Sequence, residues 1–419
     1  KVAKLDGERI VFDRPVPDKT PEEGWFLVMD RTASSDGVVI RNCTFMGAAK
    51  FLSKTYITCQ NCRFIAVGLG QTALDETTVG KCFEGKKDGA HTVLDNCTFR
   101  YCYGASRGIF VFSDQQGYYE LKDCLFEQCS GSVGISIYCA QLLGCEHGNG
   151  LVSGVTFRNC WSTTGGWIAA FSNGGAIVTN CLFEGCSVAQ NAAKNQTANT
   201  SDCPCLLAGS TSPTASLKMY NCTFRDNTVD RTVGNHVNSK NAQAAIAYAK
   251  GNSGSAFVNC TFANNTVTCE SFNSDYPAKS SVLLVRDIVG QQLAKAGVAN
   301  CTFLGPNDGT PDFRQNGTHG QVSTLLNCIF TTEDPNAVLS PFVSDCPGSL
   351  DVIDCAAENM YPELQPSNLR TLSGLVYDHI PVKEVAAGMY GNLALVPTVK
   401  VPDIRTSADL SPNAKRASS

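Results

Sequence analysis

The sequence predicts an all-β fold, a right-handed parallel β-helix (solenoid) of about ten turns with N- and C-terminal caps. A phrase built on Asn-Cys-x-Phe returns ten times along the chain, and its copies are 19 to 41 residues apart. A fixed phrase at variable spacing indicates stacked turns joined by loops of differing length. Between the copies lie short apolar runs without helical periodicity, such as residues 108–112 and 281–285, which predict a third strand in each turn.

Each copy of the phrase has the pattern of two short strands joined by a bend. An apolar residue or Cys stands two positions before the key residue, Cys follows it directly in nine copies, and Phe always stands three positions after it. The inward alternation changes phase at the key residue, which must therefore tolerate a left-handed backbone, as Asn, Asp and Gly do. We expect stacked Asn side chains to bond one another from turn to turn. This ladder comprises Asn42, Asn61, Asn96, Asn180, Asn221, Asn259, Asn300 and Asn327, with Asp123 and Gly154 in the two other copies.

The extent of the repeat suggests four segments. Residues 1–37 are expected to form an N-terminal cap, 38–335 the β-helix, 336–401 a C-terminal cap region, and 402–419 a flexible tail or linker. Caps are expected because the open edges of a solenoid need protection.

Most of the 22 cysteines fall on repeat positions. The column that follows the Asn residues would place like atoms about 4.8 Å apart, wider than the roughly 3.8 Å between the Cβ atoms of a disulfide. We therefore expect buried thiols that act as small hydrophobic groups. A second column, three residues after Phe, is also expected to be buried and to act as small hydrophobic groups. It comprises Cys102, Cys129, Cys160 and Cys186 and continues as Asn227 and Asn265.

Other cysteines lie off these columns, and two pairs are predicted loop disulfides, Cys139 with Cys145 and Cys346 with Cys355. Cys59 and Cys62 form a CxxC, but both occupy inward repeat positions and no second CxxC or His pair is in register. No metal site and no cofactor are expected.

Composition excludes some partners. Charged residues make up 17% of the chain and the net charge is −5, without the basic cluster that follows a phosphate backbone, so nucleic acid is not expected. No run of about 20 apolar residues predicts a transmembrane helix. No signal peptide is found at Lys1, as in a mature or excised piece.

Two further features carry a resemblance. The Phe-x-x-Asn motifs at 224–227 and 262–265, together with Gly-Gly-Ala-Ile at 174–177, resemble the repeat pair of the chlamydial polymorphic outer-membrane protein family. The resemblance covers residues 38–330. It implies a right-handed parallel β-helix passenger that is exported, displayed on the cell surface and often adhesive.

The third strands are apolar on both alternating faces, which predicts burial on both sides. The cover is expected to be the insertions at 188–213, 229–243 and 267–279, or a second copy of the protein. The expected partners are thus the protein itself, as an oligomer or filament, or a surface protein or glycan. The predicted interface residues are Phe110, Phe112, Tyr138, Ile246, Leu283 and Val285.

The alternative is a polysaccharide-active lyase or glycoside hydrolase. Such chemistry needs acidic or basic side chains clustered on neighbouring turns. The weak catalytic candidates Asp114, Arg286 and Asp287 follow the third strand, but Asp114 is on a different turn from the other two.

The chain also contains Asn-x-Thr/Ser acceptor sequences for glycosylation. Those inside the repeat phrase, such as Asn221-Cys-Thr, are expected to be buried. Better placed candidates are Asn195, Asn199, Asn264 and Asn316. The sequence as a whole predicts an extracellular or cell-surface structural or adhesive module without catalysis.

Overall fold

The computed structural model describes a large part of the chain, and every regular element in that part is a β-strand. The described residues are 2–6, 9–12, 26–29, 38–47, 50–53, 57–67, 83–86, 91–103, 107–112, 118–130, 141–146, 149–162, 166–172, 176–189, 203, 205–209, 217–231, 243–250, 255–270, 279–286, 296–305, 310–316, 322–332, 341–345, 350–353, 355–357 and 371–373.

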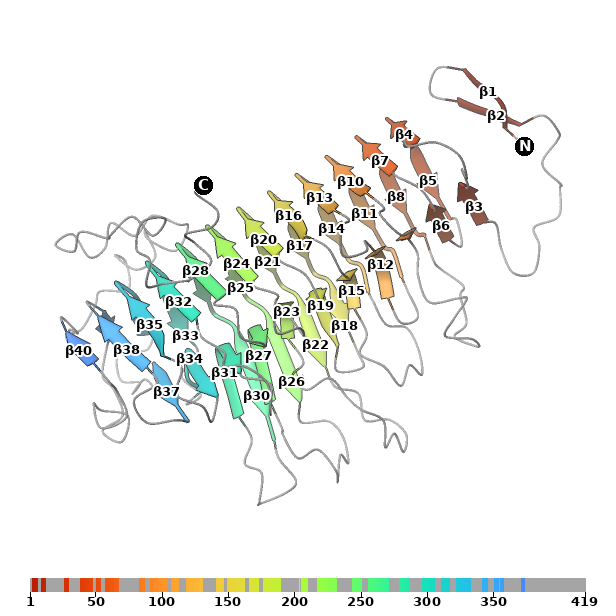
Figure 1. Cartoon of the computed structure of the whole chain (residues 1–419). Helices are drawn as coiled ribbons and strands as arrows, with labels where there is room; N and C mark the ends of the chain where they lie inside the picture. Colours follow the sequence, from red (N-terminus) through yellow and green to blue (C-terminus); the bar gives the residue numbers. More distant parts are fainter. Residues whose placement is uncertain are drawn as a thin grey trace, which may run out of the picture.

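Three long sheets run along the molecule, as Figure 1 shows. Sheet B contains β3 (Phe26–Met29), β6 (Lys50–Ser53), β9 (Phe83–Lys86), β12 (Arg107–Phe112), β15 (Gln141–Glu146), β19 (Trp167–Ser172), β23 (Cys205–Gly209), β27 (Gln243–Lys250), β31 (Lys279–Arg286), β34 (Phe313–Asn316) and β37 (Phe342–Ser344). Sheet C contains β4 (Val38–Arg41), β7 (Ile57–Gln60), β10 (His91–Asp95), β13 (Tyr118–Lys122), β16 (Asn149–Ser153), β20 (Ala176–Thr179), β24 (Leu217–Tyr220), β28 (Ser255–Val258), β32 (Ala296–Ala299), β35 (Ser323–Leu326), β38 (Leu350–Ile353) and β40 (Thr371–Ser373). Sheet D contains β5 (Thr44–Met46), β8 (Arg63–Ile65), β11 (Thr98–Arg100), β14 (Leu125–Glu127), β17 (Thr156–Arg158), β21 (Leu182–Glu184), β25 (Thr223–Arg225), β29 (Thr261–Ala263), β33 (Thr302–Gly305), β36 (Ile329–Thr332) and β39 (Ala356–Ala357).

Two smaller sheets complete the described structure. Sheet E contains β18 (Trp161–Ser162), β22 (Ser187–Ala189), β26 (Thr228–Arg231) and β30 (Thr266–Cys269). An antiparallel hairpin joins β1 (Val2–Asp6) to β2 (Arg9–Phe12).

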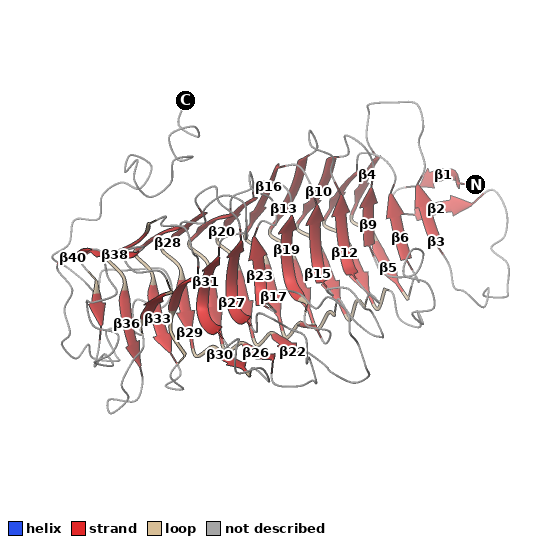
Figure 2. Cartoon of the chain, turned by 60° about the horizontal axis from the view of Figure 1, so that its bottom comes forward, coloured by secondary structure: helices blue, strands red, loops and turns tan. Residues whose placement is uncertain are grey.

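In each long sheet the strands follow one another in chain order, and neighbours pair in parallel. A chain that supplies one strand to each sheet before returning to the first is a coil, seen in Figure 2 from another side. The structure is therefore the parallel β-helix that the sequence predicts, including its third strand per turn.

The coil extends beyond the borders expected from the repeat. Sheet C has twelve strands rather than ten, and β37 to β40 lie in the segment predicted as a C-terminal cap region. The last turn lacks the diagnostic Phe, since Ala357 pairs with Phe330 and takes its place in the register. At the other end, β3 lies in the segment predicted as the N-terminal cap and pairs with β6. Residues 402–419 lie outside the described part.

The key residue of each copy turns the chain between sheets C and D. All ten key residues have positive φ angles, from 48° at Asn96 to 66° at Gly154, which confirms the predicted left-handed corner. Their side chains lie on the outside of a convex bend. Asn42, Asn96 and Asn221 are accordingly exposed, so the expectation that Asn in the phrase is buried was wrong for much of the rod, whereas Asn300 and Asn327 are buried.

The predicted bonds between Asn side chains occur along this corner. Asn61 Nδ2 donates to Asn42 Oδ1 at 3.2 Å, and Asn96 Nδ2 donates to Asn61 Oδ1 at 2.8 Å. The same bond joins Asn221 to Asn180, Asn259 to Asn221, and Asn327 to Asn300. Asp123 and Gly154 interrupt the ladder between Asn96 and Asn180. Asp123 Oδ1 occupies the space where a Cβ at position 154 would lie.

A second corner, two residues after Phe, ends sheet D. Here too φ is positive, at Ala66, Tyr101, Gln128, Asn159 and Asp226 among others. The sequence analysis missed this corner because its residues share no chemical type. It redirects the chain into sheet E, which is the fourth side of the coil at the turns from β18 to β30.

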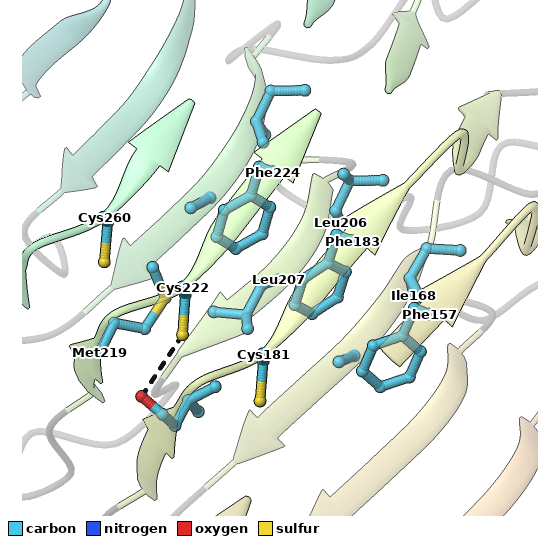
Figure 3. Packing of buried hydrophobic residues seen from close by; sticks show 14 of the residues in the cluster. Phe157, Ile168, Cys181, Phe183, Leu206, Leu207, Met219, Cys222, Phe224 and Cys260 are labelled. Carbon is cyan, nitrogen blue, oxygen red and sulfur yellow. Dashed lines mark hydrogen bonds between the residues drawn. The ribbon is translucent and has the colours of Figure 1, made fainter. Parts of the chain in front are cut away.

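The Phe residues of the phrase form one continuous stack inside the rod. From Phe45 to Phe330, neighbouring rings lie 4.5 to 5.1 Å apart between centroids. This is close to the roughly 4.8 Å between paired strands, so each ring rests on the next without distortion of the backbone. Figure 3 shows Phe157, Phe183 and Phe224 in this stack, with Cys181, Cys222 and Cys260 in the adjacent column.

The Cys column that follows the key residues is buried as predicted, but its thiols also form hydrogen bonds. Cys97 Sγ donates to the carbonyl of Cys59 at 3.3 Å, and Cys124 Sγ to the carbonyl of Leu94 at 3.4 Å. Cys222 Sγ reaches the carbonyl of Val178 at 3.6 Å (Figure 3). Each of these three thiols thus links its own turn to the preceding one. Burial raises the pKa of the Cys160 and Cys301 thiols, which keeps them protonated as donors.

The second column uses the same bond with two kinds of donor. Cys160 Sγ donates to the carbonyl of Phe126 and Cys186 Sγ to that of Phe157, each at 3.4 Å. Where the column changes to Asn, Asn227 Nδ2 donates to the carbonyl of Phe183 at 3.0 Å. The amide therefore takes over the role of the thiol at the same place.

One predicted disulfide does not match the structure. Cys355 has a buried free thiol on the first column, where Cys328 N donates to its Sγ at 3.3 Å. It was misplaced in a loop because the turn it belongs to lacks Phe. Cys346 and Cys139 lie outside the described residues, and for Cys145 only the backbone in β15 is described.

The outer face of sheet D carries alternating charges on successive turns. Arg100 Nε lies 2.6 Å from Glu127 Oε2, and Arg158 Nε lies 3.0 Å from Glu184 Oε2. Arg225 pairs with Glu184 from the other side. The charges on this face are paired from turn to turn, and the partly exposed pairs contribute little to stability individually.

Replacing Asn180 by Val should lower the free energy of unfolding by about 1–3 kcal/mol, because a β-branched residue is strained at the φ of 54° found there. Asn180→Gly should lose less, since it gives up only the exposed bond from Asn221. Urea unfolding followed by circular dichroism compares the two. Equal losses would contradict the role of backbone conformation at this corner.

Replacing Asn227 by Val should cost about 1–3 kcal/mol for each buried group left unbonded, here the carbonyl of Phe183 and the amide of Cys186. Asn227→Cys should be clearly milder because a thiol is the donor at this position in earlier turns. Melting temperatures of the two variants test this. A Cys variant as unstable as the Val variant would show that the thiol and the amide are not equivalent.

Candidate functional site

The outer face of sheet B is the most distinctive surface of the described structure, because its long strands are bent. In β27, the consecutive residues Ile246 and Ala247 both lie in the interior core, and so do Val282 and Leu283 of β31. A straight strand alternates its side chains, so two inward neighbours mark a kink toward the core. The outer face is therefore concave at this point.

Two side-chain contacts support the bend independently. Arg286 at the end of β31 bonds Gln243 at the start of β27, and Lys279 at the start of β31 bonds Asn316 at the end of β34. A straight strand of eight residues would span about 23 Å at roughly 3.3 Å per residue. This is farther than either pair of side chains can bridge, so the ends of the strands must approach each other.

An apolar cluster fills the centre of the concave face. Its buried members are Cys203, Cys205, Ala208, Ala245, Tyr248 and Leu284, with half-buried Trp167 against them. Trp167 Nε1 donates to the carbonyl of Cys203 at 2.8 Å. The third strands are thus buried on both faces within one chain, and no second copy is needed to bury this cluster.

Three predicted interface residues lie on the opposite side of the sheet. Ile246, Leu283 and Val285 are at most 1% exposed and belong to the interior core. Their assignment as contact residues was wrong, because the kink reverses the alternation and leaves Leu284 and Tyr248 on the outside instead. The sequence pattern alone did not reveal this reversal, since both faces are apolar.

The other predicted interface residues are only partly described. The backbone of Phe110 pairs with Glu84 and Gly144, in the row that leads to Ala208, Tyr248 and Leu284. Phe112 ends β12 and pairs with Lys86 and Glu146. Tyr138 lies outside the described residues.

Basic side chains gather beside the apolar cluster, where the ends of sheet E meet sheet B. Arg231 Nη1 donates to the carbonyl of Gln243 at 2.8 Å, and Arg286 Nη1 donates to Oε1 of the same glutamine at 3.2 Å. The two arginines are only 5% and 8% exposed. Two buried guanidinium groups therefore share one neutral residue.

Lys279 and Arg314 extend this group toward the C-terminal turns. Lys279 Nζ lies 3.0 Å from Asp345 Oδ2, and Arg314 Nη1 lies 2.9 Å from Asp345 Oδ1. We call Arg231, Lys279, Arg286 and Arg314 the basic cluster. Asp345 is the carboxylate paired with Lys279 and Arg314, and no described carboxylate contacts Arg286.

Two buried polar atoms of this surface have no hydrogen-bond partner among the described residues. They are Ser281 Oγ and Arg314 Nε. Ser281 is fully buried and pairs in register with Ala245 of the outer apolar cluster. Buried polar groups in proteins are normally bonded, so these atoms mark a place where further polar contacts fit.

Of the weak catalytic candidates, Arg286 alone lies among the described residues. Asp114 and Asp287 lie outside the described residues, and Arg286 is held by Gln243. Both mechanisms of glycoside hydrolysis use a pair of carboxyl groups about 5 to 10 Å apart. Asp345, the carboxylate bonded to Lys279 and Arg314, already accepts from two cations.

The remaining site predictions have mixed outcomes. Asn264 is exposed at the second corner, with φ at 52°. Asn316 is half-buried and bonded to Lys279, whereas Asn195 and Asn199 lie outside the described residues. In the described part of the chain no group of three or more His, Cys, Asp and Glu side chains is placed to hold a metal ion, and no apolar helix of membrane-spanning length occurs there.

Sequence reasoning singled out Arg286 but missed Arg231, Gln243, Lys279 and Arg314. The signal available was weak, since each residue is a single polar position at the end of a short strand. Gln243 and Lys279 open the two longest strands of sheet B. Only the pairing of those strands places them next to each other.

Three comparisons with known proteins bear on the fold. Residues 81–282 match the family model described as a right handed beta helix region, which supports a β-helix family and the predicted right-handed parallel β-helix. The match does not distinguish the polymorphic outer-membrane proteins from other β-helices. No curated protein sequence matches the chain significantly.

Among solved structures, the catalytic unit of a thermostable GH87 alpha-1,3-glucanase from Streptomyces thermodiastaticus is similar, with a TM-score of 0.41 and 12% sequence identity. The alignment covers 85% of this chain and 62% of that one. No site residue is transferred from this likeness, because fold similarity at this level does not identify function.

Cys269 reports on the basic cluster. Burial raises the pKa of its thiol to about 11, and the Arg231 guanidinium opposes this rise. The rate of alkylation of Cys269 by iodoacetamide, followed by peptide mass spectrometry, should therefore keep rising toward pH 11 rather than level off near the ordinary thiol pKa of about 8.5. Arg231→Gln should shift the profile to higher pH, since the cation that stabilises the thiolate is removed.

Arg63 on sheet D provides the control, because it is exposed and on a different face. Arg63→Gln should leave the alkylation profile of Cys269 unchanged. A profile that is the same in the Arg231 variant and in the unaltered protein would contradict the proximity of these two groups.

Proposed function

We propose that the protein is an extracellular β-helical binding module, of the structural or adhesive kind, that meets a surface partner with the outer face of sheet B. The observation that carries the proposal is the concave outer face with its partly exposed basic cluster. The exposed part of this cluster consists of Arg314 and Lys279, whose side chains are 15% and 29% exposed. The resemblance of the repeats to displayed, often adhesive passengers agrees with this role.

Self-assembly through the apolar cluster on the outer face of sheet B receives less support than binding to another molecule. The outward residues Ala245, Tyr248 and Leu284 are already buried within the single chain. A second copy would gain little by covering side chains that are already removed from water.

Catalysis is the competing function, and the described outer face offers no specific observation in its favour. The carboxylate of Asp345 is engaged by Lys279 and Arg314. Paired carboxylates with separate acid and base roles are what polysaccharide hydrolysis requires.

Light scattering over a concentration series should give a monomer near the chain mass of 44.7 kDa. The same protein on arrays of surface glycans and surface proteins should bind a ligand without releasing reducing sugar from any glycan. Growth into multimers with concentration would favour a self-assembling rod, and release of reducing sugar would favour the enzyme.

Variants locate the binding face. Lys279 has a side chain that is 29% exposed, so Lys279→Glu places a negative charge on the outer face of sheet B and should abolish array binding. Arg63→Glu makes the same change of charge on sheet D and should leave binding intact. Loss of binding in both variants, or in neither, would contradict the assignment of this face.

A further inference from the structure

Arg286 is the starting point, because its charge is buried and poorly compensated. It is 8% exposed, its one bond is to the neutral Gln243 side chain, and no described carboxylate contacts it. A buried charge without an opposite charge is costly in a folded protein. An opposite charge supplied by a ligand would offset that cost.

Two further observations point in the same direction. Ser281 Oγ and Arg314 Nε are buried on this face without a hydrogen-bond partner among the described residues. The two strands that carry Ser281 and Arg314 are adjacent, with Leu284 paired to Arg314. Three incompletely bonded groups thus lie on two neighbouring strands, beside the more exposed Lys279.

The charge of this surface selects the sign of the ligand. Three cations, Lys279, Arg286 and Arg314, lie here, and Asp345 is the carboxylate among the described groups bonded to them. A guanidinium group can donate two parallel hydrogen bonds to two oxygens of a carboxylate or of a sulfate group. The ligand should therefore carry such oxyanions.

The chemistry of the unpaired atoms narrows the class further. A hydroxyl such as Ser281 Oγ both donates and accepts, whereas Arg314 Nε only donates. Sugars with acidic groups offer hydroxyls and oxyanions side by side. Nucleic acid fits less well. The chain has a net charge of −5, and the four cations of the basic cluster cover too short a region to follow a phosphate backbone.

We propose that the basic cluster binds the carboxylate or sulfate groups of an acidic polysaccharide, with Arg286 as the buried anchor and Lys279 and Arg314 at the solvent side. This rests on the proposed binding function and names its ligand class. The side chain of Arg314 is 15% exposed and that of Lys279 is 29% exposed. Both are more exposed than Arg286.

The test measures binding of the full chain to three soluble polymers by titration calorimetry: polygalacturonate, dextran sulfate and uncharged dextran. The first two separate carboxylate from sulfate recognition, and the third reports binding to sugar without charge. We expect binding to at least one charged polymer, weakening with salt, and none to uncharged dextran. No binding to either charged polymer would overturn the proposal.

Matched variants separate the anchor from general electrostatics. Arg286→Gln should weaken binding about 10- to 100-fold, the range expected for loss of a hydrogen bond to a charged group. Arg63→Gln, an equal change of charge on sheet D, should change it less than about twofold, since an exposed charge is screened. Equal losses in both variants, or no loss for Arg286→Gln, would overturn the proposal.

Folding is checked by the melting temperature of each variant. If Arg286→Gln does not fold, Arg286→Lys and Arg314→Gln replace it, since both alter the guanidinium contacts and leave Gln243 in place. Retention of full affinity in both would overturn the anchor role. Duplex DNA serves as a comparison, and binding as tight as that of the acidic polysaccharide would overturn the ligand class.

The outcomes also distinguish this proposal from the broader one. A neutral ligand found on the arrays, with binding lost in Lys279→Glu and no affinity for charged polymers, would retain the binding module and remove its acidic ligand. If no array ligand is found but polygalacturonate or dextran sulfate binds tightly, both the binding module and its acidic ligand class are retained.

Discussion

Backbone hydrogen bonds between parallel strands set a distance of about 4.8 Å from one turn to the next, and the interior depends on it. Phe rings at that separation stack face to face, as from Phe64 to Phe99 at 4.5 Å. Thiols at that separation reach the carbonyl of the preceding turn, as Cys97 does with Cys59. Each residue type in the phrase is thus one that can interact with its own copy one turn away.

The corners convert this one-dimensional stack into a closed coil. A left-handed residue between sheets C and D lets two short strands face the same core at an angle, and a second one adds the turn into sheet E. Because the first corner is convex, its Asn side chains bond one another at the surface. The rod is therefore held by backbone ladders on its sides and by amide bonds along an edge.

The outer face of sheet B departs from this regularity. The kink that places Ile246 and Ala247 in the core makes the outer surface concave, and it brings Gln243 within reach of Arg286. Regular faces, such as the paired charges of sheet D, satisfy themselves from turn to turn. The concave face does not, since buried polar atoms stay unbonded there, which is why we propose that binding takes place on it.

The sequence by itself determined the coil, the first corner and the contents of the core, because these repeat and the repeat reports a position in every turn. It did not determine the second corner, where Ala66, Tyr101 and Gln128 share no type, nor the last turn, where Ala357 replaces Phe. Only the tertiary structure decided which face of the third strand is outside, since both faces are apolar and the kink reverses the alternation. It alone also placed Arg231 and Arg286 on one glutamine, 55 residues apart in the chain, because their contact depends on how the turns stack.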